Sequence, residues 1–334
     1  MTTHGVLGAF SLPDLPHHDL SPPRGAWLLG IGSPLGDDQD VLPLADEYAL
    51  KASQAAGGDG HRPALVGCFL DVPGHPLRWE AEVGRLDAVL GYCEARGLAL
   101  NLGVAMVGAD GQARDREIAD GMFAPEVDEV VGRLAARPGV LAYLRIGVEV
   151  NRPGLYHAGA LPDAWRVVRA RVPNSAGHVR AAWCVDPSGF DPWEGDPKDW
   201  VPRLDEVQVW SVDLFDRDHF APVADPTLPG TAASRIVSSV LRSARAARRR
   251  VLIGESSPVL LGATSPGWWG PLLDLLSDSR DVLEAVTLLP VDWTGTKWDA
   301  WGNARYQDDQ SFLRDLLRSV DLRGAVHAPP GVPW

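Results

Sequence analysis

Two glutamates stand at the carboxyl ends of two buried-strand patterns in this sequence. The first, Glu149, lies in the segment 143–151, where residues 144, 146, 148 and 150 are all apolar. Because alternate side chains of a β-strand point to opposite faces, we predict that this apolar set faces a helical layer. The other set then faces inward, with the last two residues nearest the carboxyl end: Tyr143, Arg145, Gly147, Glu149 and Asn151.

The second glutamate, Glu255, follows the apolar run 251–253 and Gly254, and Pro258 closes the segment. If Glu255 points into the barrel, the alternation predicts that Ile253 does too and that Gly254 leaves room for a helix outside. A carboxylate at the end of a buried strand is costly unless it is paired or used in chemistry. We therefore expect a function or a partner for it.

A pair of carboxyl groups can supply a general acid/base and a nucleophile. The alternative is that each glutamate is a structural ion-pair partner. Arg145 is a candidate partner for Glu149, but four positions along a strand span roughly 13 Å, which is too far for direct contact. Two such glutamates at the ends of two buried strands favour a catalytic function.

The surrounding elements alternate between short apolar runs and amphipathic stretches, which is typical of a parallel sheet with crossover helices. We predict eight strands, at residues 26–32, 64–72, 98–107, 140–151, 178–185, 206–214, 250–256 and 285–293. We predict helices at 42–56, 77–96, 125–137, 162–171, 232–248, 268–277 and 310–320, and a long loop at 186–205. Eight strands predict a single-domain (β/α)8 TIM barrel. We assign residues 1–20 to an N-terminal extension, 21–323 to the barrel and 324–334 to a C-terminal tail.

The composition excludes several classes of partner. The net charge of −13 argues against nucleic acid and against an anionic membrane surface. No apolar run is long enough to span a membrane, and no secretion signal is evident. The three cysteines, Cys68, Cys93 and Cys184, have no metal-ligand or disulfide spacing. We therefore expect a cytoplasmic protein.

Further polar and aromatic side chains follow the predicted strands. Flat aromatic rings at a barrel mouth suit sugar rings, although core packing is the alternative for any tryptophan. Aspartates there can bind hydroxyl groups, or cap helices and turns instead. The candidate substrate-binding residues from this pattern are Trp183, Asp186, Trp210, Asp213, Asp292 and Trp293. No histidine spacing, phosphate loop or nucleophile elbow is present, so we expect no metal and no cofactor.

Several segments resemble clan A retaining glycoside hydrolases, and most of all the family 26 β-mannanases and their bacterial relatives. The resemblance covers roughly residues 140–310, and its motifs lie at 144–151, 210–216, 253–258, 292–293 and 301–305. It implies that Glu149 is the general acid/base and Glu255 the nucleophile, and that Asn151 and Tyr156 bind substrate. Val148 stands where the clan usually has Asn and family 26 has His. The aromatic hydroxyl that commonly orients the nucleophile from strand six is not evident, and Ser211 or Asp213 could substitute.

These observations predict a cytoplasmic, cofactor-free retaining glycoside hydrolase that acts on a β-linked small glycoside or oligosaccharide. An alternative is a glycosidase-like barrel recruited to the biosynthesis of a specialised metabolite, with the same glutamates used for acid/base cyclisation, elimination or rearrangement. A third alternative is an inactive carbohydrate-binding barrel. Whether the chain forms a homo-oligomer is left open.

Overall fold

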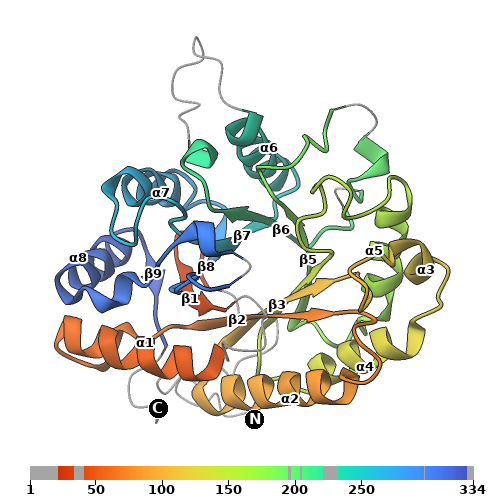
Figure 1. Cartoon of the computed structure of the whole chain (residues 1–334), viewed down its shortest axis with the longest axis horizontal. Helices are drawn as coiled ribbons and strands as arrows, with labels where there is room; N and C mark the ends of the chain where they lie inside the picture. The colour runs from red at the N-terminus through yellow and green to blue at the C-terminus, as the bar shows by residue number, and fades with distance from the viewer. Residues whose placement is uncertain are drawn as a thin grey trace, which may run out of the picture.

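The computed structural model describes residues 22–33, 41–194, 197–203, 205–220, 232–296 and 298–328. Eight parallel strands form a closed barrel, because β1 pairs with both β8 and β2 while each other strand pairs with its neighbours in the chain. The predicted TIM barrel is therefore confirmed. Figure 1 shows the helices arranged around these strands. The barrel strands are β1 (Trp27–Gly32), β2 (Leu65–Asp71), β3 (Ala99–Ala105), β4 (Ala142–Ile146), β5 (Val179–Val185), β6 (Val209–Leu214), β7 (Arg250–Ser256) and β8 (Leu283–Leu288).

The helices agree with the predicted ones to within a few residues, because each has an apolar stripe packed on the sheet. They are α1 (Val41–Ala56), α2 (Trp79–Arg96), α4 (Ala124–Ala135), α5 (Ala160–Arg171), α6 (Ala232–Ala246), α7 (Pro266–Asp278) and α8 (Gln310–Asp321). The short helix α3 (Asp115–Ala119) was not predicted. Short 3-10 helices are η3 (Asp59–His61), η4 (Pro197–Asp199), η5 (Arg217–Phe220), η6 (Asp299–Trp301) and η7 (Tyr306–Asp308).

The two ends of the chain differ from the expected boundaries. The N-terminal extension, residues 1–20, lies outside the described residues. Residues 325–326, which we assigned to a C-terminal tail, instead form β9 (Ala325–Val326), a strand that pairs in parallel with β1. None of the helices in the described ranges is both long and apolar enough to cross a membrane.

The barrel interior holds an apolar cluster near the amino ends of its strands, beside the buried ion pair of Glu284 with Arg180, and polar side chains near the carboxyl ends. One end is filled by a cluster that includes Leu65, Tyr143, Val209 and Leu252. Toward the carboxyl ends of the strands, the inward side chains become polar, and Asn101 donates hydrogen bonds to Thr287 Oγ1 at 2.9 Å and to the carbonyl oxygen of Gly254 at 2.8 Å. The polar end is where barrel enzymes place their active sites.

A β-bulge in β7 changes which residues face this polar interior. The pairing of β6 with β7 shifts register so that Val212 lies opposite Ile253 but Asp213 lies opposite Glu255. Gly254 is the extra residue, and a bulge of this kind re-aims the side chains that follow it. Ile253 packs in the outer, helix-facing core, so the prediction that it points inward is wrong.

Gly254 itself faces the interior, which also corrects the prediction that it leaves room for a helix. A Cβ atom at Gly254 would lie 2.6 Å from Asp213 Oδ1, 2.7 Å from Arg145 Nη1 and 2.8 Å from Ser211 Oγ. No side chain fits there without displacing polar groups. Glycine at this position therefore allows the bulge and the interior polar cluster to coexist.

We predict that Gly254→Ala lowers the free energy of unfolding by about 1–3 kcal/mol, the usual cost of overpacking a filled interior. Denaturant unfolding would measure the change. Gly84→Ala is the matched control, since Gly84 is an exposed helical glycine with open space around it and the substitution should stabilise slightly. Equal stability of Gly254→Ala and the unmodified protein would contradict the close packing described here.

Candidate active site

A buried arginine organises the polar end of the barrel. Arg145 on β4 has no exposed side-chain surface, and its Nη1 lies 3.1 Å from Asp213 Oδ1 and 3.0 Å from Glu255 Oε1. Its guanidinium carbon also lies 4.9 Å from the centroid of the Phe69 ring. The sequence suggested Arg145 only as a partner of Glu149. The barrel instead brings it beside carboxyl groups from β6 and β7.

One guanidinium therefore faces two buried carboxyl groups. Burial raises the pKa of Asp213 well above its usual range, the Glu255 charge adds to this, and Arg145 opposes it. Burial also raises the pKa of Glu255, while the charge and hydrogen bond of Arg145 oppose the rise. Because a single positive charge compensates a single carboxylate, this pair favours a proton on Asp213, whose hydrogen bond, together with Arg145, helps to keep Glu255 charged.

Glu149 lies in a turn beyond β4 and not in the strand itself. β4 ends at Ile146, and both Gly147 (φ 72°) and Glu149 (φ 51°) adopt the left-handed region. A non-glycine residue in this conformation is uncommon and occurs often at functional sites. The turn interrupts the alternation on which the sequence prediction depended. Val148 consequently lines the cavity with Glu149, and the prediction that Val148 faces the helices is wrong.

The environment of Glu149 favours its protonated form. Burial raises its pKa to about 7, and the negative charges of Glu255 and Asp186 add to the effect. Arg152 opposes it from 2.8 Å away. A carboxyl group with a pKa near neutrality is suited to general acid/base catalysis at neutral pH.

Glu149 and Glu255 line one cavity of about 250 Å³ at the carboxyl ends of the strands. Its wall is largely aromatic and apolar, with a few charged groups, as is typical of small-molecule sites. The described lining residues include no histidine or cysteine, the usual nitrogen and sulfur ligands of zinc. The other residues that line the cavity are Phe69, Asp71, Ala105, Val148, Arg152, Leu155, Phe215, Trp293, Trp298 and Trp301.

Of the predicted substrate-binding residues, Trp293 and Asp186 lie at the site. Trp293 lines the cavity. Asp186, at the end of β5, is close enough to both glutamates for its charge to raise the pKa of each. Asp213 has no exposed surface and contacts Arg145, so the prediction that it binds substrate is replaced by a supporting role beneath Glu255.

Three other predicted substrate ligands use their polar atoms to hold the backbone. Asn151 Nδ2 donates to the carbonyl oxygen of Asp186 at 2.7 Å, and its Oδ1 accepts from the amide of Asp186 at 2.8 Å. The Tyr156 hydroxyl accepts from the amide of Met106 at 3.3 Å. Asp292 accepts from the amide and hydroxyl of Thr294. None of the three is among the described residues that line the cavity, and their substrate-binding role stays a prediction.

Trp183 and Trp210 lie outside the barrel interior, contrary to prediction. On β5 the residues flanking Trp183 face inward, and Ser211 and Asp213 do so on β6, so both tryptophans point toward the helical layer. Their rings pack edge to face with centroids 5.3 Å apart. Both are fully buried, which confirms the core-packing alternative for this pair.

The loop after β8 supplies aromatic residues that the prediction of substrate ligands omitted. Trp298 and Trp301 line the cavity, and the Trp301 ring lies 4.9 Å from Trp293 and 5.1 Å from Phe215. The abundance of tryptophan after the last strand was a signal for them. Phe69 and Asp71, at the end of β2, had no sequence signal because that part of the chain carries no recognisable motif.

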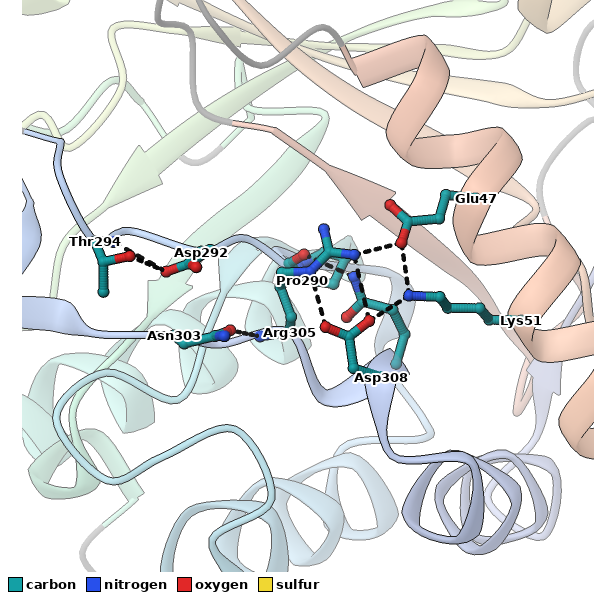
Figure 2. A network of polar contacts seen from close by, with 9 residues as sticks. Glu47, Lys51, Pro290, Asp292, Thr294, Asn303, Arg305 and Asp308 are labelled. Carbon is teal, nitrogen blue, oxygen red and sulfur yellow. Dashed lines mark hydrogen bonds and ion pairs between the residues drawn. The ribbon is translucent and has the colours of Figure 1, made fainter.

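A network of charged residues anchors the β8 loop to α1. Arg305 pairs with Glu47 on α1 and with Asp308, and Lys51 pairs with both acidic residues. Figure 2 shows these four side chains converging, with Asn303 and Asp292 beside them on the same loop. The side chain of Asn303 accepts a hydrogen bond from the amide of Arg305 at 2.8 Å. The network thus fixes the loop that carries Trp298 and Trp301.

This chain is similar in fold to several solved structures. No family model and no curated protein matches the sequence. Among solved structures, the catalytic domain of an endo-β-1,4-mannanase from Bacillus sp. JAMB-750 is 11% identical with a TM-score of 0.61, over 98% of this chain and 94% of that one. A β-mannanase from a symbiotic protist of the termite Reticulitermes speratus is 14% identical with a TM-score of 0.56, over 96% and 99%.

A third similar structure, the mannanase BCman of Bacillus subtilis, is 12% identical with a TM-score of 0.53, over 90% of this chain and 89% of that one. The fold is that of the family 26 β-mannanases. The resemblance inferred from the sequence is confirmed at the level of fold. At these identities the similarity extends to the barrel and leaves the reaction to be argued from the site.

We predict that Arg145→Met lowers the free energy of unfolding by about 3–5 kcal/mol, because it leaves two buried carboxyl groups without a cation. The loss should be smaller at pH 5 than at pH 8, since both carboxyl groups have raised pKa values and are neutralised as the pH falls. Denaturant unfolding at the two pH values would measure it. Adding Asp213→Asn should recover part of the loss.

Arg166→Met is the matched control. Arg166 pairs with Asp163 and Glu206 at the surface, where an ion pair contributes about 0–1 kcal/mol. An Arg145→Met variant no less stable than this control, or one with the same loss at both pH values, would show that Arg145 does not compensate buried carboxyl charge.

Proposed function

We propose that this protein is a retaining glycoside hydrolase that acts on β-linked sugars, with Glu149 as general acid/base and Glu255 as nucleophile. The observation that carries the proposal is that one cavity holds two carboxyl groups in different electrostatic environments. Glu255 contacts the Arg145 guanidinium, which favours its charged form. Glu149 has a pKa of about 7 and can hold a proton at rest.

In the proposed reaction, the Glu255 carboxylate attacks the anomeric carbon while the Glu149 proton passes to the departing glycosidic oxygen. A glycosyl ester on Glu255 forms as that carbon–oxygen bond breaks. Water then attacks the same carbon, Glu149 accepts its proton, and Glu255 leaves as a carboxylate. The charge on Glu255 disappears in the ester, which lowers the pKa of Glu149 and suits its change from acid to base.

A small substrate fits the cavity better than a polymer. The cavity volume of about 250 Å³ is just below the roughly 300–1,000 Å³ of typical ligand pockets, and the aromatic wall of the cavity can stack on a sugar ring. A small β-glycoside or oligosaccharide is therefore the proposed substrate. A cytoplasmic location agrees with Cys68, Cys93 and Cys184, which are all buried and form no disulfide.

A trapping experiment tests the nucleophile. An activated 2-deoxy-2-fluoro β-glycoside should label the protein once, and peptide mapping should place the label on Glu255. Glu255→Gln should take up no label, whereas Glu129→Gln, at a partly exposed pair with Arg133 on α4, should be labelled normally. Glu149→Gln should lower kcat/KM on an unactivated glycoside by roughly 10²–10⁴-fold.

A second candidate function is supported by the cavity wall. Val148 lines the cavity at the position where the clan usually has Asn or His, so ordinary sugar recognition loses a polar contact. A barrel recruited to the biosynthesis of a specialised metabolite could use the same glutamates for proton transfer without a sugar. No label from a panel of fluoroglycosides, with another activity lost in both Glu→Gln variants, would favour this candidate. Carbohydrate binding unchanged by either variant would indicate an inactive binding barrel.

The pH dependence of hydrolysis provides a separate prediction. Because Glu149 must be protonated to act as the acid, kcat/KM should fall as the pH rises through about 7. Arg152→Gln should move this fall to higher pH, since the Arg152 guanidinium lowers the pKa of Glu149. Arg318→Gln, at an exposed position on α8, is the control and should leave the profile unchanged. An identical profile for Arg152→Gln and the unmodified enzyme would contradict the assignment of this limb to Glu149.

A further inference from the structure

Away from the catalytic cavity, two histidines and an aspartate from three separate segments converge. His61 Nε2 lies 2.8 Å from Asp321 Oδ2, and His327 Nε2 lies 2.7 Å from Asp321 Oδ1. The two imidazole rings are 5.0 Å apart between centroids. The three candidate ligand atoms all lie within 4.8 Å of one another. The cluster therefore places two nitrogens and a carboxylate oxygen around one point.

The cluster lies at the end of the barrel opposite the cavity. His61 ends η3, which comes just before β2, and Asp321 is the last residue of α8. His327 directly follows β9, which pairs with Trp27 and Leu28 at the start of β1. Since the cavity lies at the carboxyl ends of the strands, this cluster has no access to the proposed reaction. Residues at this end of a barrel generally serve stability.

The donor set is typical of a transition metal. Zn²⁺ binds imidazole nitrogen and carboxylate oxygen at about 2.0–2.2 Å, and three protein ligands leave a fourth position for water. Ca²⁺ and Mg²⁺ prefer sites made of oxygen atoms. Two tetrahedral ligands of zinc lie roughly 3.4 Å apart at these bond lengths. To admit the ion, the hydrogen-bonded pairs would need to separate by roughly 0.6–0.7 Å, and any pair near the 4.8 Å limit would need to approach by roughly 1.4 Å.

The exposure of the cluster suits an exchangeable ion. The Asp321 side chain is 37% exposed and that of His327 only 9%, so water can reach the site from one side. The Nδ1 atoms of His61 and His327 are buried and have no hydrogen-bond partner among the described residues. Metal-bound histidines usually donate this second N–H, and loss of such a partner costs about 10–100-fold in affinity. We therefore expect micromolar rather than nanomolar binding.

We propose that His61, Asp321 and His327 bind one Zn²⁺ ion that fastens the C-terminal segment to the barrel. This segment is otherwise held by backbone hydrogen bonds, from Trp27 to Gly324 at 3.0 Å and from Ala328 to Arg62 at 3.1 Å. The ion adds a cross-link between the end of α8, the residue after β9 and the loop before β2. This proposal is independent of the proposed hydrolase function.

Titration of the metal-free full-length protein with ZnCl2, followed by calorimetry, tests the proposal. We expect one saturable site, and an upward shift of Tm when zinc is in excess, because a ligand that binds only the folded state stabilises it. His61→Gln and His327→Gln should each weaken binding by at least roughly 100-fold, more than the loss of an outer partner. CoCl2 should give the visible absorption of nitrogen-ligated cobalt in the unmodified protein, which reports on the site without any variant.

Two controls separate this site from other histidines. His157→Gln should bind zinc normally, because His157 pairs with Asp115 at 2.7 Å and belongs to no three-residue ligand group among the described residues. A variant with His17 and His18 both changed to Gln should also bind normally. The proposal is overturned if the unmodified protein shows no saturable zinc binding. It is equally overturned if both cluster variants retain full affinity, or if the His17 and His18 variant loses it.

Discussion

The polar end of this barrel depends on the ion pairs that the buried Arg145 guanidinium forms. A guanidinium without exposed surface is stable only when carboxyl groups compensate it, and here Asp213 and Glu255 do so from two neighbouring strands. The bulge at Gly254 lets consecutive residues of β7 face the interior, so that Glu255 reaches the same guanidinium nitrogen as Asp213. Charge compensation and backbone geometry therefore fix one orientation for Glu255.

The raised pKa of Glu149 depends in part on Glu255. Burial raises the pKa of Glu149, and the negative charge of Glu255 raises it further. The two glutamates differ in their environments because Glu255 contacts a fully buried cation, whereas Glu149 pairs with the exposed Arg152 and borders an apolar cavity wall. This difference is what a reaction that needs one ionised and one protonated carboxyl group requires. The aromatic β8 loop, anchored to α1 by Arg305 and Lys51, closes the cavity around both.

The barrel could be predicted because eight apolar runs alternate with amphipathic stretches along the chain. The positions of both glutamates could be predicted because each follows an apolar run. Prediction failed where the backbone leaves the regular strand. The predicted alternation of side chains between the two faces of a strand holds only for an uninterrupted strand. The turn at Gly147 and the bulge at Gly254 therefore reversed the predicted directions of Val148, Ile253 and Gly254. Trp183 and Trp210 were misplaced because an aromatic residue near a strand end fits a core as well as a site. The partners of Arg145 lie on other strands, and no local pattern in the sequence specifies them.

Carbon-13 NMR of glutamate side chains would test the central claim most directly, with Glu149→Gln and Glu255→Gln used to assign the two carboxyl signals. We expect Glu149 to titrate near pH 7, since burial and the negative charge of Glu255 both raise its pKa. Replacing Glu255 with Gln should therefore lower the pKa of Glu149. A Glu149 signal that titrates near 4.5, or one that does not move when Glu255 is replaced, would contradict the account.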